Sequence, residues 1–155
     1  MFLENFLNKY NNKNIKLFVD MDGVIADYDV GKASKYDQKR PLLTSISKLE
    51  KISKKDNIEL YILSISKIND GIKEKNIWLD KYAPFFKKEN RIIISKESNQ
   101  NLSSKELKSN YFNSFELSLD PNDIIIFIDD DPRIIKEVRL NHPNIIILKD
   151  TALVD

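Results

Sequence analysis

One short stretch, residues 15–25, limits more than any other what this chain can fold into. An apolar run, Ile15–Val19, is rich in branched and aromatic side chains. It ends in two aspartates one residue apart, Asp20 and Asp22, with Gly23 directly after them. A short run of this composition, bounded by a turn residue, is typical of a buried strand. Ligands of open parallel sheets bind at the carboxyl ends of the strands, so the two aspartates are expected at a functional site.

Further apolar runs follow and alternate with segments of helical spacing. The predicted strands are 15–20, 58–63, 91–94, 123–128 and 144–148, and the predicted helices are 2–11, 41–52, 70–82, 103–112 and a last one from 132 onward. The runs are nearly continuous in isoleucine, which indicates strands covered on both faces and hence an α/β fold with a parallel sheet. Since no linker or repeat divides residues 1–155, we expect one domain.

Polar residues of suitable kinds follow two more of these strands. Ser64 follows the second strand, and Asp129 and Asp130 follow the fourth. Carboxylates that gather at one sheet edge repel one another unless a cation lies between them. Mg²⁺ suits such a site because it prefers oxygen ligands and keeps coordination positions for water and phosphate oxygens.

Composition excludes several classes of function. The net charge is +1, so no overall field favours nucleic acid or a membrane surface. There is no cysteine, which excludes disulfides and thiolate metal sites. No apolar run is long enough to span a membrane, and the first residues lack a basic leader, so a cytoplasmic location is expected.

The string Asp20-Met-Asp-Gly-Val24 resembles the first motif of the haloacid dehalogenase (HAD) superfamily of phosphohydrolases. Extended to Asp27, it is especially similar to the 5'(3')-deoxyribonucleotidase branch and its bacterial relatives. Two further segments, Ile77–Pro84 and Phe127–Pro132, are also similar to the bacterial nucleotidase-like proteins. The resemblance implies a Rossmann-like core with strand order 5-4-1-2-3, in which the ends of strands 1, 2 and 4 lie side by side.

The resemblance also implies a role for each candidate residue. Asp20 would attack phosphorus and form an aspartyl-phosphate, while Asp22 would protonate the leaving oxygen and later deprotonate water. Mg²⁺ would be bound by Asp20, by the backbone carbonyl of Asp22 and by Asp129 or Asp130. Ser64 would donate a hydrogen bond to the phosphate. The expected activity is Mg²⁺-dependent hydrolysis of a phosphomonoester, with a 5'-nucleotide as one candidate substrate.

Two of these assignments have competitors in the sequence. The phosphate-binding lysine is either Lys105, at the start of a helix that opens with a capping box, or Lys96, directly after the third strand. We prefer Lys105 because a helix start suits that motif. Ser66 competes with Ser64, which we prefer because it follows the strand directly. His142, the only histidine, is expected in a surface loop.

Two other functions use similar residues. A receiver-type signalling domain also has clustered aspartates, Mg²⁺ and a lysine, but its phosphoacceptor follows strand 3, where this chain has Ser95. A catalytically silent HAD domain could serve as a binding module.

One departure from the nucleotidase pattern concerns the cap over the site. The polar stretch 26–40, with Tyr28, Gly31 and Tyr36, is too short for a helical cap. It is predicted to form a loop or small hairpin, in which Tyr28 or Tyr36 could stack on a base. Such an open site suits a larger phosphorylated substrate, or a homo-oligomer in which a neighbour supplies the lid.

Overall fold

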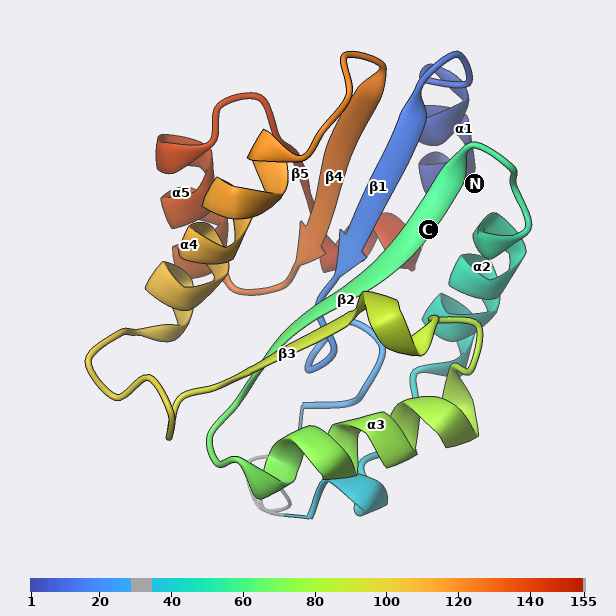
Figure 1. Cartoon of the computed structure of the whole chain (residues 1–155). Coiled ribbons are helices and arrows are strands. Elements are labelled where there is room, and N and C mark those ends of the chain that lie inside the picture. The colour runs from blue at the N-terminus through green and yellow to red at the C-terminus, as the bar shows by residue number, and fades with distance from the viewer. Residues whose placement is uncertain (29–34, 155) are drawn as a thin grey trace.

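A five-stranded parallel sheet forms the centre of the protein (Figure 1). The structure is a computed structural model that describes residues 1–28 and 35–154. The strands are β1 (Asn14–Val19), β2 (Ile58–Ser66), β3 (Arg91–Ser95), β4 (Asp123–Asp129) and β5 (Ile146–Lys149). Their order is β3-β2-β1-β4-β5, and every neighbouring pair is parallel. This is the predicted order 5-4-1-2-3, and it confirms the α/β fold with a single Rossmann-like core.

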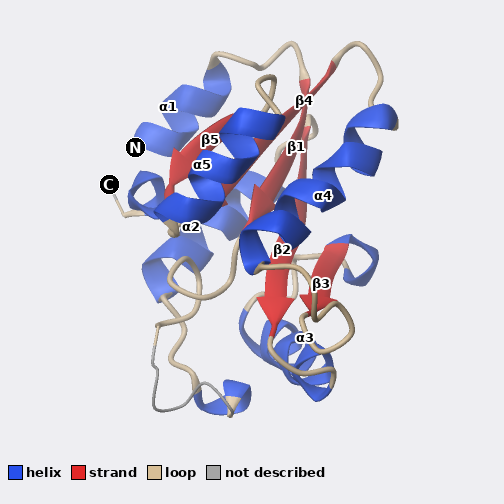
Figure 2. Cartoon of the chain, turned by 90° about the vertical axis from the view of Figure 1, so that its left-hand side faces the viewer, coloured by secondary structure: helices blue, strands red, loops and turns tan. Residues whose placement is uncertain are grey.

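Helices cover both faces of the sheet. They are α1 (Phe2–Asn8), α2 (Leu43–Ser53), α3 (Asp70–Tyr82), α4 (Ser104–Leu117) and α5 (Pro132–Asn141), with 3₁₀ turns η2 (Tyr36–Gln38), η3 (Lys88–Asn90) and η4 (Asp150–Leu153). Helices α4 and α5 lie on one face, and α1, α2 and α3 lie on the other (Figures 1 and 2). In the described part of the chain, no helix combines the length and the apolar character that a membrane crossing requires.

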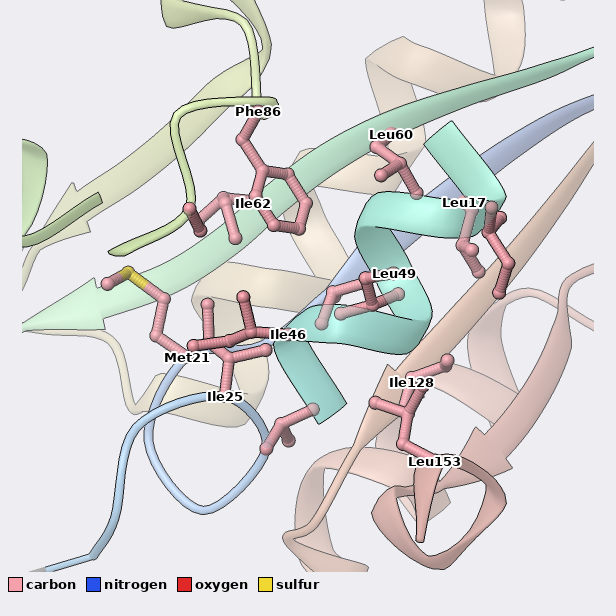
Figure 3. Packing of buried hydrophobic residues seen from close by; sticks show 14 of the residues in the cluster. Leu17, Met21, Ile25, Ile46, Leu49, Leu60, Ile62, Phe86, Ile128 and Leu153 are labelled. Atoms are coloured by element: carbon pink, nitrogen blue, oxygen red, sulfur yellow. The ribbon is translucent and has the colours of Figure 1, made fainter. Parts of the chain in front are cut away.

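Strand alternation divides the core into two apolar layers. On β1, Leu17 and Val19 point to the layer under α2, while Phe18 points to the layer under α4 and α5. Figure 3 shows the first layer, in which Leu49 of α2 packs among residues of β1, β2 and β4. Successive residues of a strand face opposite layers. The same alternation determines on which face of the sheet the side chains just after each strand lie.

The helix ends follow local chemistry. The Ser103 hydroxyl accepts from the Glu106 backbone N–H, and the Glu106 carboxylate accepts from the Ser103 N–H, so the predicted capping box begins α4. At α5, the Asp131 carboxylate accepts from the Arg133 N–H, and Pro132 occupies the first turn. Asp131 is therefore the helix cap, which leaves Asp130 outside that role.

Two expectations about the elements need correction. The second helix begins at Leu43 instead of Pro41, because Pro41 pairs with Ala26 in an isolated antiparallel bridge. Helix α4 continues to Leu117, five residues beyond the expected end, because Phe115 packs on Phe18 and keeps the last turn against the sheet. Gly31 of the expected loop lies outside the described residues.

A third correction concerns His142, which is 2% exposed instead of lying in a surface loop. Its Nε2 is 2.7 Å from the Ser109 backbone oxygen, and its Nδ1 contacts the Glu116 carboxylate. The residue sits at the C-terminal end of α5 and joins that helix to α4. Both partners of the imidazole belong to α4, and the packing of α4 on α5 buries the ring. Local sequence does not show this packing.

Candidate functional site

Asp20 and Asp129 meet because β1 and β4 are in matching register. Phe18 pairs with Phe127 across the two strands, and each aspartate lies two residues beyond its phenylalanine. With the period of two in a strand, both carboxylates lie on the face covered by α4. The Asp20 N–H still donates to the Ile128 carbonyl at 3.0 Å, so the strand pairing extends to the aspartate. The two carboxylates are 7% and 0% exposed respectively.

A lysine of α4 lies between these two carboxylates. The Phe112 ring packs on two rings of the sheet, with centroid distances of 5.1 Å to Phe18 and 5.4 Å to Phe127. This packing determines which face of α4 is turned toward the sheet. Lys108 is four residues earlier, one turn nearer the strand ends. Its Nζ lies 2.9 Å from Asp20 Oδ1 and 2.7 Å from Asp129 Oδ2.

Asp130 completes a group of three acidic residues that could hold a metal ion. One carboxylate oxygen each from Asp20, Asp129 and Asp130 lies within 4.8 Å of the others. Burial raises the pKa of Asp20, and the neighbouring carboxylates add to this shift while Lys108 opposes it. Burial and Asp129 likewise raise the pKa of Asp130. One lysine against three carboxylates leaves negative charge uncompensated, and oxygen-only ligands suit Mg²⁺.

The two acids of the fourth strand differ in what already binds them. Asp129 Oδ2 accepts from Lys108, and its Oδ1 accepts from the Asp131 N–H at 2.9 Å. Asp130 is half-buried and lines the cleft described below. These contacts favour Asp130 as the acid that a cation would reach and Asp129 as the acid that holds Lys108.

Gly23 lets the chain pass directly over Asp130. It has a φ of +80°, and a Cβ built on it would lie 2.0 Å from Asp130 Oδ2. The turn is closed by hydrogen bonds from the N–H groups of Val24, Ile25 and Ala26 to the Met21 carbonyl. A left-handed φ favours glycine, and so does the close approach to a carboxylate.

We therefore expect Gly23→Ala to weaken both fold and site. Backbone strain and the contact with Asp130 should together lower the free energy of unfolding by about 1–3 kcal/mol. The displaced carboxylate should also reduce the stabilisation of the folded chain by added Mg²⁺. Gly71→Ala is the matched control, because its Cβ would press on the Ser66 hydroxyl but its φ is ordinary. Parent-like stability of Gly23→Ala, with the same response to added Mg²⁺, would contradict this reading of the turn.

Asp22 lies beside the acidic group but has different partners. Its Oδ1 is 2.6 Å from Lys39 Nζ, and its Oδ2 is 3.2 Å from Lys75 Nζ. Burial alone would raise the pKa of Asp22, but the ammonium groups of Lys75 and Lys39 hold it below its usual range. Asp22 is therefore an ionised carboxylate that two lysines hold in place.

Ser64 lies within β2, which continues to Ser66. Its side chain is fully buried, and its Oγ accepts from Lys75 Nζ at 2.7 Å. By alternation it shares the α3 face with Ile62, whereas Ile65 lines the cleft. The structure thus brings Ser64 to Asp22 through a lysine, but not to the cleft surface as the sequence predicted. Ser66 is engaged locally, since its Oγ donates to the Ile68 carbonyl.

Neither predicted lysine contacts the acids. Lys105 is exposed on α4, and Lys96 follows β3, where its N–H continues the ladder to the Ser66 carbonyl. The structure places Lys108 against the carboxylates, which corrects the position predicted for Lys105. The sequence holds a signal for this, because Lys108 is one turn before Phe112 on the apolar face of the same helix.

Two more lysines of this region, Lys39 and Lys75, were missed by sequence reasoning. Lys75 also lies on an apolar helix face, with Gly71 four residues before it and Leu79 four residues after it. Lys39 follows η2, and its ammonium lies 4.8 Å from the centre of the Tyr36 ring. No local pattern indicates that Lys39 turns inward.

An open cleft of about 580 Å³ gives access to the acids. Charged side chains line most of it, together with the predicted substrate-contact residue Tyr28. The other lining residues are Asp20, Asp22, Ile65, Ser104, Lys108, Asp130, Asp131, Pro132, Arg133 and Ile134. Tyr28 is 68% exposed. Between β1 and α2, the described residues contain one 3₁₀ turn and no larger helical cap.

Comparison with known proteins shows similarity in fold alone. No family model and no curated protein matches the chain. Two structures of the Pnkp1/Rnl/Hen1 RNA repair complex each contain a chain that is 16% identical, with TM-scores of 0.64 and 0.67. Each match covers 88% of this protein and 43% or 46% of the other chain, so this chain spans less than half the length of those proteins.

A third structure, DsGPDH of Dunaliella salina, is also 16% identical, with a TM-score of 0.50. The match covers 91% of this protein and 24% of that chain. At these identities the comparisons establish the α/β architecture and do not assign a family.

Proposed function

We propose that this protein is a Mg²⁺-dependent phosphomonoester hydrolase of the HAD type, acting through an aspartyl-phosphate on Asp20. The observation that carries the proposal is the convergence of Asp20, Asp129 and Asp130 around Lys108 at the carboxyl end of the sheet. The motif resemblance and the HAD-like strand order support it. A receiver domain has the order 2-1-3-4-5, so the observed order disfavours that alternative.

The residues present suit Mg²⁺. Asp20, Asp130 and the Asp22 backbone carbonyl would bind the cation, with Asp129 as a further candidate. When bound, Mg²⁺ would neutralise the carboxylates and polarise the phosphate oxygens. Without it, four carboxylates face three ammonium groups, those of Lys39, Lys75 and Lys108, and an anionic phosphate would meet net negative charge.

The chain's own residues supply the remaining chemistry. An Asp20 oxygen would form a bond to phosphorus as the bond to the leaving oxygen breaks. Asp22, which is ionised in the resting site, would take a proton from the phosphate monoanion and deliver it to that oxygen. Water would then attack the aspartyl-phosphate, with Asp22 taking its proton, and Asp20 would be released with inorganic phosphate. Lys108 would compensate the charge on Asp20 and the transferred phosphoryl group.

Hydrolysis of p-nitrophenyl phosphate by the purified chain, with and without Mg²⁺, tests the proposal. Mg²⁺-dependent release with measurable turnover would support an enzyme, and trapping a long-lived acyl-phosphate would instead favour a signalling domain. No release from p-nitrophenyl phosphate, mononucleotides or 5'-phosphorylated oligonucleotides would favour a silent binding module and overturn the proposal.

Alanine variants of the acidic run should separate metal binding from helix capping. Asp130→Ala should raise the Mg²⁺ concentration for half-maximal activity by more than the roughly tenfold effect of losing an outer-shell partner. Asp131→Ala is the control, because Asp131 caps α5. Asp129→Ala should weaken folding as well, because it removes an acceptor of Lys108. Matching Mg²⁺ titrations for Asp130→Ala and Asp131→Ala would show that Asp130 is not a ligand of the cation.

The substrate class follows from the open cleft. A lid that closes over a small substrate adds contacts and excludes water. The described residues carry no such lid, so a terminal phosphate on a larger molecule and a 5'-nucleotide are both candidates. The likeness to a chain of an RNA repair complex fits a polynucleotide end. Kinetics on nucleotides and 5'-phosphorylated oligonucleotides, with sedimentation to detect a homo-oligomer, would distinguish them. A monomer with micromolar KM for a free nucleotide would exclude the larger substrate.

A further inference from the structure

Lys75 is a charged residue in a core position. On α3 it follows Gly71 by one turn and precedes Trp78 and Leu79, all of them buried, and it is itself only 4% exposed. A methionine or leucine would fill such a position at no electrostatic cost. Burying an ammonium group is expensive unless it is fully hydrogen-bonded, so this placement needs a reason beyond packing.

The ammonium of Lys75 is fully satisfied. It donates to Ser64 Oγ at 2.7 Å, to the Ile65 carbonyl at 2.7 Å and to Asp22 Oδ2 at 3.2 Å. An ammonium has three N–H donors, so these three acceptors use all of them. The side chain therefore joins α3, the end of β2 and the residue two positions after Asp20.

This arrangement determines how the Asp22 carboxylate is held. The buried Ser64 oxygen accepts from Lys75 and so helps to fix the position of the ammonium group. Asp22 is held at one oxygen by Lys75 and at the other by Lys39. The Asp22 carboxylate lines the cleft, whereas Lys75 does not.

We infer that Lys75 is a positioning residue, which orients the Asp22 carboxylate for phosphoryl transfer without contacting the substrate. This inference rests on the proposed function and adds a residue to it. The expected signature is a fall in kcat of about 10- to 100-fold, since small misplacement of reacting groups costs rates of that order. The KM should change little.

The test replaces the ammonium and then rebuilds it. The chain has no cysteine, so Lys75→Cys introduces a single thiol. Alkylation with 2-bromoethylamine in urea, followed by refolding, restores an ammonium at nearly the length of lysine. Alkylation with iodoethane gives a side chain of similar bulk without charge. Lys73→Cys, exposed on the same helix, receives both treatments as a control, and the parent chain is refolded alongside.

We expect aminoethylation to restore kcat in Lys75→Cys and ethylation not to. Equal recovery of kcat with both reagents would show that Lys75 acts only through its packing, and would overturn the inference. Lys75→Met provides a second measurement if the cysteine variant refolds poorly. It should keep a melting temperature near that of the parent, because Lys39 still pairs with Asp22. A parent-like kcat in folded Lys75→Met would also overturn the inference.

The activity of the parent chain distinguishes failure of the proposed function from failure of the role inferred for Lys75. If the parent itself hydrolyses no phosphomonoester with Mg²⁺, the proposed function fails, and the role of Lys75 fails with it. If the parent is active and the Lys75 variants match it, only the role of Lys75 is refuted.

Discussion

The Asp20→Asn variant should release phosphate at least about a thousandfold more slowly than the parent, because an amide cannot form the aspartyl-phosphate. Its fold should survive. Replacing a carboxylate beside Asp129 and Asp130 reduces repulsion among buried acids, although one contact of Lys108 is weakened. The measurement is kcat at saturating substrate and Mg²⁺, together with the melting temperature.

Acid quenching of a labelled substrate during turnover adds a direct readout. The parent should carry a covalent phosphoryl group that hydroxylamine releases, and Asp20→Asn should carry none. Asp27→Asn is the matched control, because Asp27 pairs with Arg40 outside the acidic group. Near-parental turnover in purified Asp20→Asn would sink the proposed mechanism, whatever metal dependence remained.

The second large effect is expected for Lys108→Met. The ammonium lies between two buried carboxylates, which raise its pKa although burial alone would lower it. Removing one member of a buried, paired group leaves the others uncompensated, at a cost of about 3–5 kcal/mol of folding free energy. Loss of a positioned cation beside the transferred phosphoryl group should slow turnover about 100- to 1000-fold.

Urea unfolding of Lys108→Met, with and without Mg²⁺, measures the predicted loss of folding free energy separately from the loss of activity. A cation that binds the folded state should recover part of the lost stability. Lys105→Met is the control, since Lys105 is exposed three residues earlier on the same helix. A loss of activity confined to Lys105→Met would restore the assignment made from the sequence and reject the one made from the structure.

Sequence patterns predicted the elements well where a strong local signal exists. The apolar run before Asp20, the capping box at Ser103 and the proline at 132 all lie where the structure begins or ends an element. The acids predicted at two strand ends do lie close together, because a parallel sheet brings its carboxyl ends to one edge. Asp20, Asp129 and Asp130 follow from that rule alone.

The lysines show where sequence reasoning stopped. Lys105 was chosen from its place at a helix start, whereas the contact is made by Lys108, which the packing of Phe112 turns toward the sheet. Hydrophobic periodicity would have placed Lys75 and Lys108 on inner helix faces, had buried lysines been considered. Ser64 was predicted to follow the second strand, but β2 continues to Ser66, so Ser64 lies within the strand and its direction is set by strand alternation.

By itself, then, the sequence determined the alternation of strands and helices and the acidic strand ends, because these depend on neighbours a few residues apart. The tertiary structure decided which cations pair with those acids. Lys39, Lys75 and Lys108 reach Asp20 and Asp22 from segments 17 to 88 positions away. Such pairings depend on strand register and helix rotation, which are set by the packing of the two apolar layers and not by any local pattern.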